Sequence, residues 1–244
     1  PFILFDTDGD GEADASIQVQ AGLTGGDVMA VYDGTNTVVT FEEFLPLLEE
    51  GQAVDPDLVN GIINQLFLRG NGQTGFQVTL RDMGFAGYDN VVGVYEINAD
   101  GDIVDTRILF ENANADKTAT TTITDVEVGH SLGFFIVQDA ADWAESLTNE
   151  EMLNLSFVNS DGDMANIADE NDMAIAVNGV TTDEIVFHSF SEDLNSDGVQ
   201  HALSGVEEGG EAITVGFEDL TGGGDEDYED VVFTVTQVDE VFLI

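Results

Sequence analysis

Carboxylates alternate with other small residues and glycine in three segments of this 244-residue chain, a spacing suited to binding a metal ion. The first segment is Asp6-Thr-Asp8-Gly-Asp10-Gly-Glu12-Ala-Asp14. Calcium takes six to eight hard oxygen ligands, and carboxylates at alternate positions of a turning loop can converge on one ion. Asp6, Asp8 and Asp10 fill the first, third and fifth positions of an EF-hand-like loop, but Ile17 stands where an EF-hand has its bidentate glutamate. We therefore expect a truncated calcium loop with ligands among Asp6, Asp8, Asp10, Glu12 and Asp14.

Two more segments of this kind lie near the carboxyl end of the chain. Glu192-Asp193-Leu-Asn195-Ser-Asp197-Gly198 repeats the alternate spacing, with glycine directly after the last acid. The other runs from Glu218-Asp219 through three glycines to Asp225-Glu-Asp-Tyr-Glu-Asp230. Carboxylates crowded into one turn raise one another's pKa unless a cation lies among them. The metal ligands predicted in these two segments are Asp193, Asn195, Asp197, Glu218, Asp219, Asp225, Asp227 and Asp230.

The charge of the whole chain also calls for neutralisation. There are 50 Asp and Glu residues against 4 Lys and Arg, a formal net charge of −46. Such a charge opposes the compact state through self-repulsion. Calcium in the acidic loops is one remedy. Adaptation to high salt is the other, and it predicts acids spread evenly over the surface instead of gathered at glycine turns.

Composition also excludes several classes of partner and site. Nucleic acid is not expected as a partner, because phosphate binding needs lysine and arginine. Direct membrane insertion is not expected either, because no apolar run approaches the roughly 18–20 residues of a membrane span. The chain has no cysteine, which excludes disulfides, thiol nucleophiles and thiolate metal sites.

No enzymatic motif stands out. The histidines His130, His188 and His201 lack the paired spacing of a zinc site, and the serines lack a Gly-x-Ser-x-Gly elbow. We expect His201, beside the second acidic segment, to be structural, the alternative being that it orients a ligand there. Carboxylate pairs suited to glycoside hydrolysis exist, but the acids prefer turns. The protein is predicted not to be an enzyme, with a secreted glycan-active hydrolase as the less favoured alternative.

The elements that must position these acids are predicted to be mainly β. Short apolar runs separated by Gly, Asp and Asn turns favour an antiparallel, jelly-roll-like β-sandwich. A short helical insertion is predicted near 139–154, with Trp143 as a packing residue. The predicted strands are 76–82, 91–98, 103–110, 119–128, 132–138, 173–178, 183–190, 212–218 and 230–238.

The first 70 residues are predicted to form a separate, small α+β region. Strands are expected at 2–5 and 16–20, and a hairpin at 28–32 and 37–40 around Asp33-Gly34. Two helices should follow, one from the capping box at 40–43 and one from Asp55-Pro56. The Gly- and Asn-rich stretch at 69–75 is the predicted boundary, which gives domains at 1–70 and 71–244.

From Phe76 to Val238 the chain resembles an uncharacterised secreted bacterial domain family that ends in a Phe-Glu-Asp-Leu…Gly-Gly-Asp-x-Asp-Tyr-x-Asp-Val-Val-Phe signature. Members of that family occur in large calcium-dependent exoproteins and adhesins, often beside RTX-type repeats. The resemblance implies a β-sandwich, calcium at the acidic turn, and a place outside the cell or on its surface. It implies no enzymatic activity, and residues 1–70 lie outside it. The signature is carried by Phe217–Leu220, Gly223–Asp225, Asp227-Tyr228 and Asp230–Phe233.

The predicted function is a non-enzymatic, calcium-stabilised module of a secreted or cell-surface bacterial protein, in adhesion or ligand recognition. Its partner would be a glycan or a peptide on a cell surface. The alternative is a self-assembling extracellular fibre or layer subunit, in which the apolar ends Phe2–Phe5 and Val241–Ile244 pair with copies of the same chain. Because the chain opens on Pro1 without a methionine, we expect it to be a piece of a longer protein.

Overall fold

The fold is known from a computed structural model. The structure describes residues 2–5, 15–18, 31–32, 37–38, 48, 50–54, 68–72, 74–82, 87–169, 173–206 and 212–239. The predicted calcium loop at 6–14 and the apolar end at 241–244 lie outside these residues, as do almost all of the two helices predicted between 40 and 66. The predictions made for those segments stay predictions.

Two small antiparallel pairs form near the amino terminus. Strand β1 (Phe2–Phe5) pairs with β2 (Ala15–Gln18). Strand β3 (Val31–Tyr32) pairs with β4 (Thr37–Val38), which confirms the predicted hairpin. The division of the chain into domains at residue 70 stays a prediction. Residues 68–70 contact the main unit, since the amide of Leu132 donates to the carbonyl of Leu68 at 2.9 Å.

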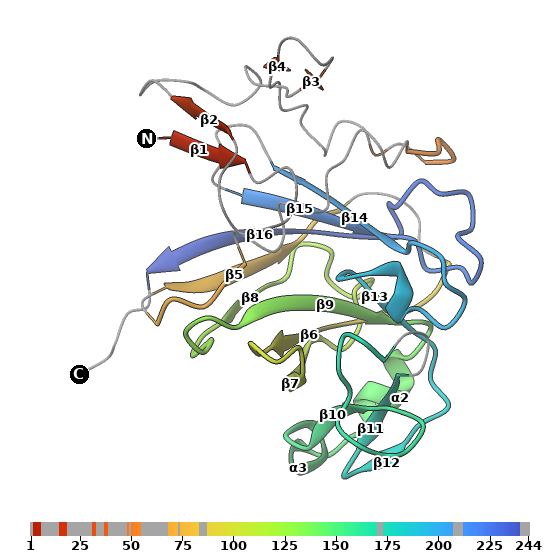
Figure 1. The fold of residues 1–244 in the computed structure, drawn as a ribbon. Coiled ribbons are helices and arrows are strands. Elements are labelled where there is room, and N and C mark those ends of the chain that lie inside the picture. Colours follow the sequence, from red (N-terminus) through yellow and green to blue (C-terminus); the bar gives the residue numbers. More distant parts are fainter. Residues whose placement is uncertain are drawn as a thin grey trace.

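The main unit is built on two antiparallel sheets, which confirms the mainly β fold (Figure 1). The five-stranded sheet has the order β14-β15-β16-β5-β8, and the four-stranded sheet has the order β13-β9-β6-β7. The strands are β5 (Thr74–Leu80), β6 (Val91–Ile97), β7 (Ile103–Phe110), β8 (Thr120–Ile123), β9 (Ser131–Val137), β13 (Val186–His188), β14 (Ala202–Val206), β15 (Ala212–Phe217) and β16 (Val231–Asp239).

Alternating side chains fill the space between the two sheets. Phe76 on β5, Phe134 on β9 and Phe233 on β16 are fully or almost fully buried there, and the rings of Phe134 and Phe233 lie 5.0 Å apart. Successive residues of a strand point to opposite faces of the sheet. Val92 and Val94 of β6 accordingly enter this core, so the two sheets form a sandwich.

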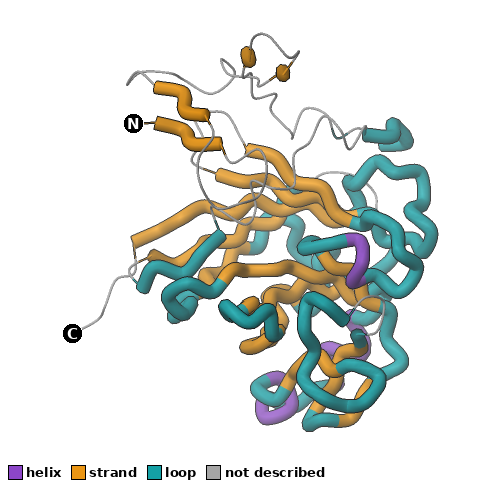
Figure 2. The backbone as a smooth tube through the Cα atoms, viewed as in Figure 1, coloured by secondary structure: helices purple, strands orange, loops and turns teal. Residues whose placement is uncertain are grey.

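The four-stranded sheet is buried on its other face as well. Tyr95 on β6 and Phe135 on β9 point away from the sandwich core into a second apolar cluster. Over this face lie α2 (Ala141–Ser146), α3 (Asn149–Met152) and a three-stranded sheet of β10 (Leu155–Val158), β11 (Ala174–Val177) and β12 (Val180–Thr181) (Figure 2). The predicted helical insertion is confirmed, and Trp143 packs against this second cluster as expected.

Three strands of the structure were absent from the predicted set, and two predicted strands, 119–128 and 183–190, are shorter in the structure, as β8 and β13. β10, β12 and β14 were not predicted. β14 reads Ala-Leu-Ser-Gly-Val, a sequence with weak strand propensity, and it is held by pairing along its whole length with β15. β8 ends at Ile123, earlier than predicted, and Asp125 follows with a φ of 60° that a regular strand does not tolerate. None of the helices in the described part of the chain has the length and apolar character needed to cross a bilayer.

Two glycines in the four-stranded sheet leave room for the aromatic residues opposite them. Gly133 pairs with Tyr95 and Gly93 with Phe135, and a Cβ added at either glycine would collide with the facing ring. Because Tyr95 and Phe135 are the centre of the second cluster, these glycines fix how the sheet meets the layer above it.

We expect Gly133→Ala to lower the free energy of unfolding by about 1–3 kcal/mol, the usual cost of overpacking a filled core. Gly87→Ala is the matched control, because Gly87 is exposed and an added Cβ there meets nothing within 4 Å. Urea unfolding of both variants measures the difference. Equal midpoints for the two variants would contradict the close packing of Gly133 on Tyr95.

Candidate metal centre

The third acidic segment forms the loop that joins β15 to β16. Phe217 at the end of β15 pairs with Val231 at the start of β16, so the loop 218–230 is closed at its base by the five-stranded sheet. Gly222, Gly223 and Gly224 have φ values of 85°, 85° and 50°, a region that glycine enters without strain. These residues turn the chain sharply enough to bring both ends of the acidic segment together.

The carboxylates at the two ends of this loop converge, and four acidic residues of the loop, Glu218, Asp219, Asp227 and Glu229, are buried. Glu218, Asp219 and Asp227 are 1%, 2% and 3% exposed. Two groups of carboxylates arise in which the possible ligand atoms all lie within 4.8 Å of one another. One group contains Glu218, Asp219 and Asp230, and the other contains Glu218, Asp225 and Asp227. All five of these residues were predicted as metal ligands.

Hydrogen bonds fix one oxygen of each carboxylate in the first group. The Asn90 side chain donates from Nδ2 to Asp219 Oδ2 at 2.6 Å, the Asp219 amide donates to Asp230 Oδ2 at 2.9 Å, and the Leu220 amide donates to Glu218 Oε1 at 3.2 Å. The second oxygen of Glu218, Oε2, is buried and has no hydrogen-bond partner when the carboxylates are ionised. When Glu218 holds a proton, its side chain can donate a hydrogen bond to Asp230. A buried carboxylate oxygen without a partner is costly, and a cation between these groups would remove that cost.

Burial and crowding disturb the ionisation of these acids. Burial, with a contribution from the charge of Asp230, raises the pKa of Glu218 to about 8. Burial also raises the pKa of Asp219 to about 7, against the hydrogen bond from Asn90, which lowers it. The pKa values of Asp227 and Asp230 are raised too, again chiefly by burial. Raised pKa values of this kind indicate a site that favours a bound proton, or another cation, over a free negative charge.

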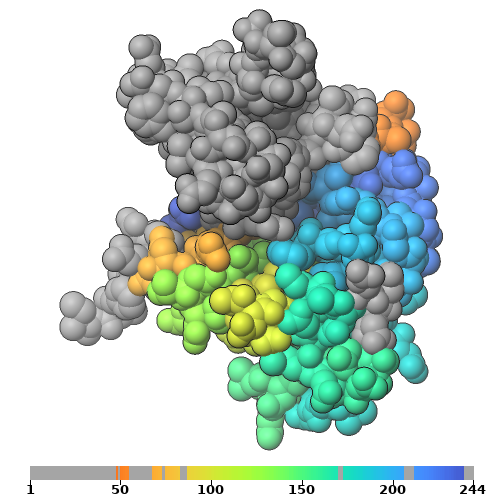
Figure 3. Space-filling view, in the orientation of Figure 1, coloured from red at the N-terminus to blue at the C-terminus, as the bar shows by residue number. Residues whose placement is uncertain are grey.

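A segment from the amino-terminal part of the chain packs against this loop. The Gly51 amide donates to Asp227 Oδ2 at 2.7 Å, and the Val54 amide donates to the Glu226 carbonyl at 2.9 Å. Leu48 and Val54 join an apolar cluster with Leu203, Tyr228 and Val232 on the outer face of the five-stranded sheet. Figure 3 shows the atoms of this segment, in orange, against the blue atoms of the carboxyl-terminal part of the sandwich. A further group of carboxylates, Glu50, Asp227 and Glu229, lies where the two meet.

The ligands predicted in the second acidic segment are engaged in other contacts. Asn195 is fully buried, accepts the His188 amide at 2.7 Å and donates to the Val199 carbonyl at 2.7 Å. Asp197 accepts the Gly222 amide at 2.8 Å, and its Oδ2 lies 3.0 Å from His201 Nε2. Asp193 is exposed at the 3-10 turn η3 (Glu192–Leu194) and accepts from the Ser191 hydroxyl. Among the described residues, no carboxylate group of the kind found at 218–230 includes Asp193 or Asp197.

Asp197 and His201 brace the acidic loop. The His201 ring stacks on Phe187 with centroids 3.7 Å apart, and its Nδ1 donates to the Glu218 carbonyl at 2.9 Å. Burial would raise the pKa of Asp197, but hydrogen bonds from Gly222, His201 and Val199 hold it below its usual range. The structural role expected for His201 agrees with these contacts.

Three residues at the site were not predicted. Asn90 directly precedes β6 of the four-stranded sheet, and the sequence around it gives no sign that it reaches Asp219. Glu50 lies far away in sequence, in the amino-terminal part of the chain. Glu229 carried a signal, because it continues the alternate spacing of Asp225 and Asp227 in the same acidic run, yet it was not among the predicted ligands.

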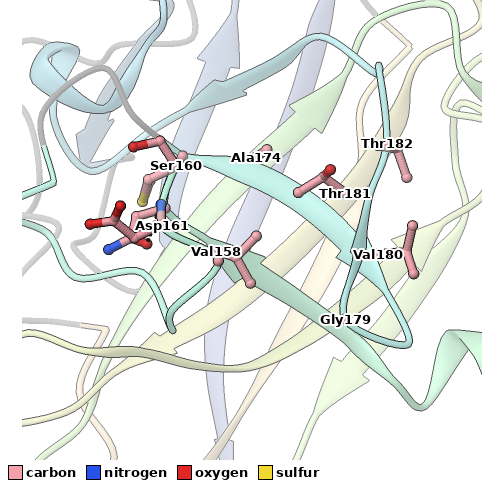
Figure 4. Close-up of a pocket in the computed structure, with 11 residues that line it drawn as sticks. Val158, Ser160, Asp161, Ala174, Gly179, Val180, Thr181 and Thr182 are labelled. Carbon is pink, nitrogen blue, oxygen red and sulfur yellow. Dashed lines mark hydrogen bonds between the residues drawn. The ribbon is translucent and has the colours of Figure 1, made fainter.

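A second surface feature lies away from the acidic loop, on the three-stranded sheet. It is an open groove of about 680 Å³ between the turn after β10 and strand β12 (Figure 4). Val180 on β12 is 69% exposed beside it. The groove combines backbone, hydroxyl and apolar surface, and its lining is Val158, Asn159, Ser160, Asp161, Gly162, Met173, Ala174, Gly179, Val180, Thr181 and Thr182.

Comparison with known proteins places part of this chain in context. Residues 126–237 match the model of a domain of unknown function, DUF4114. The matched segment contains the acidic loop and strands from both sheets, but β5 and β6, which lie at the centre of the two sheets, precede it. No curated protein and no solved structure matches the chain.

We expect the metal-free protein to lose stability as pH rises from about 5 to 8. The folded-state pKa values of Glu218 and Asp219 lie above their unfolded values. The contribution of these two carboxyl groups to the free energy of unfolding is therefore full below about pH 4 and is lost as pH rises through about 7 and 8.

Urea unfolding in EGTA at several pH values measures this loss. Glu218→Gln should flatten the profile, whereas Glu145→Gln, which removes the same charge from an exposed position on α2, should not. Identical profiles for the two variants would contradict the burial of an ionisable Glu218.

Proposed function

We propose that this chain is a non-enzymatic, calcium-stabilised module of a secreted or cell-surface bacterial protein, which acts in adhesion or ligand recognition. The observation that carries the proposal is the buried Oε2 of Glu218, which has no hydrogen-bond partner and faces other carboxylates. The resemblance of the acidic signature to domains of calcium-dependent exoproteins supports it.

The chemistry of the donors favours calcium over other common metal ions. The two groups that share Glu218 offer carboxylate oxygens alone, and hard oxygen donors suit calcium and magnesium. The nearest histidine, His201, has one ring nitrogen on a carbonyl and the other on Asp197, so imidazole is not offered. Calcium accepts irregular, many-coordinate sites, whereas magnesium needs near-ideal octahedral geometry and keeps several waters. A crowded carboxylate loop fits the larger ion.

A cation at this place would couple metal binding to folding. The loop 218–230 is the connection of the β15–β16 hairpin, and residues of both strands fill the sandwich core. In the metal-free protein the buried carboxylates must either take up protons or repel one another. Because cytosolic calcium is low, the module would gain its full stability after export.

The groove on the three-stranded sheet is the surface that we assign to recognition. It is open, it lies away from the acidic loop, and it offers backbone groups, hydroxyls and an exposed apolar side chain together. Such a mixture suits a glycan or an extended peptide. Calcium would then act by stiffening the sandwich that carries this surface, and not by contacting the ligand.

Thermal unfolding in calcium, in EGTA, and in EGTA with sodium at matched ionic strength tests the proposal. A hundredfold excess of calcium over its dissociation constant contributes about 2.7 kcal/mol per site, which is about 5–11 °C in Tm for a domain of this size. We expect that gain in the wild type and a loss of most of it in Glu218→Gln.

Glu145→Gln is the matched control for this experiment. It makes the same change of side chain at an exposed position on α2. We expect it to leave the calcium-dependent gain in Tm unchanged. If sodium alone restores the Tm lost in EGTA, the charge reflects salt adaptation and the calcium-stabilised module is wrong.

A further inference from the structure

We propose that the acidic loop binds two cations side by side, with the Glu218 carboxylate bridging them. This inference rests on the proposed function and adds the number of ions, their positions and the residue that links them. The first position is formed by Glu218, Asp219 and Asp230, and the second by Glu218, Asp225 and Asp227.

The spacing of the carboxylates separates the two positions. Oxygen ligands of one calcium ion lie at about 2.3–2.6 Å from it, so any two of them are at most about 5 Å apart. Each group meets this limit, since its ligand atoms lie within 4.8 Å of one another. Within the described part of the chain, no such group joins Asp219 with Asp225 or with Asp227. Glu218 belongs to both groups and therefore lies between them.

The surroundings of Glu218 suit a bridging carboxylate. Its Oε1 lies against the backbone of the glycine turn, where it accepts the Leu220 amide and where a Cβ at Gly224 would collide with it. Its Oε2 is buried without a partner. In two-metal sites the ions lie about 3.5–4 Å apart, a separation that one carboxylate spans with its two oxygens. The orphaned Oε2 is the observation, independent of the clustering itself, that points to a ligand.

Charge favours the same stoichiometry. The two groups contain five different carboxylates, Glu218, Asp219, Asp225, Asp227 and Asp230. When all are ionised, one divalent cation leaves a charge of −5 + 2 = −3, and two leave −5 + 4 = −1. A residual charge of −3 among buried groups remains strongly repulsive, because interactions between buried charges are weakly screened. Two ions bring these five carboxylates close to neutrality.

The two positions differ in access to solvent. Asp219 is almost fully buried and is held by Asn90, whereas Asp225 is exposed. We expect the first position to exchange its ion slowly and the second to exchange it rapidly. Filling either position reduces the repulsion felt at the other, so binding should be cooperative.

Manganese substitution of the full chain tests the bridge, because Mn²⁺ replaces calcium at oxygen sites and is detected by electron paramagnetic resonance. Two Mn²⁺ ions on one carboxylate are exchange-coupled and give about twice as many hyperfine lines, at half the spacing, as an isolated ion. We expect this coupled signal in the wild type. Asp225→Asn, at an exposed position that the fold does not depend on, should abolish the coupling and remove one bound ion per chain.

The calcium bound per chain is counted in each variant and compared with that in the wild type. Any calcium bound by the amino-terminal acidic segment cancels in this difference, because that segment is unchanged in every variant. Asp225→Asn and Asp219→Asn should each lose one ion per chain, and Glu218→Gln should lose two. Glu145→Gln, at an exposed position on α2, should lose none. If Glu218→Gln loses one ion and no coupled signal appears, the loop holds one cation, so the bridge is wrong while the proposed function stands. If Glu218→Gln loses none, both are wrong.

Discussion

The conflict between hydrogen-bonded strand pairing and buried negative charge governs this structure. The β15–β16 hairpin brings Glu218 and Asp219, at the end of one strand, against Asp230, at the start of the other. The pairing of Phe217 with Val231 cannot form without this approach, and both residues belong to the sandwich core. The fold therefore forces carboxylates together at a place from which water is largely excluded. Protons or metal ions must balance that charge, and so the stability of the sandwich depends on what the loop binds.

The rest of the molecule keeps this loop from relaxing outward. Asn90, next to the four-stranded sheet, donates a hydrogen bond to Asp219. Asp197, which also contacts His201, accepts a hydrogen bond from Gly222 in the glycine turn. Gly51 reaches Asp227 from the amino-terminal part of the chain. Each of these contacts fixes the backbone or one oxygen of a carboxylate. The acids cannot lower their repulsion by swinging into solvent, as surface acids do. A site braced in this way is preorganised for a cation.

The sequence predicted the strands best where both faces of a sheet are buried. β6, apart from Glu96, and β9 are apolar runs because alternate residues serve two different cores, and such runs are strong signals. β14 was missed because its pairing partner, and not its own composition, makes it a strand.

For the site, the acidic run at 218–230 was sufficient to predict five converging carboxylates. The spacing of Asn195 and Asp197 matches that of metal ligands equally well, yet these side chains bind backbone amides and a histidine. Alternate spacing predicts that side chains lie on the same face of a turn, but it does not predict which groups they contact there. Contacts such as Asn90 with Asp219 join residues far apart in sequence and leave no local trace.

The position of the site also bears on what a complete unit of this domain is. The match to DUF4114 begins at residue 126, but β5 lies between β16 and β8, and β6 lies between β9 and β7. A chain cut at that residue would leave β16 and β9 with long unpaired edges in the middle of their sheets, which favours aggregation. It would also lose Asn90 and the segment that carries Glu50 and Gly51, and with them the contacts that hold Asp219 and Asp227. Strand pairing and the acidic loop thus require the same upstream residues. The structural unit of the sandwich accordingly starts at β5 or earlier, and its candidate metal centre is assembled from both sides of the family match.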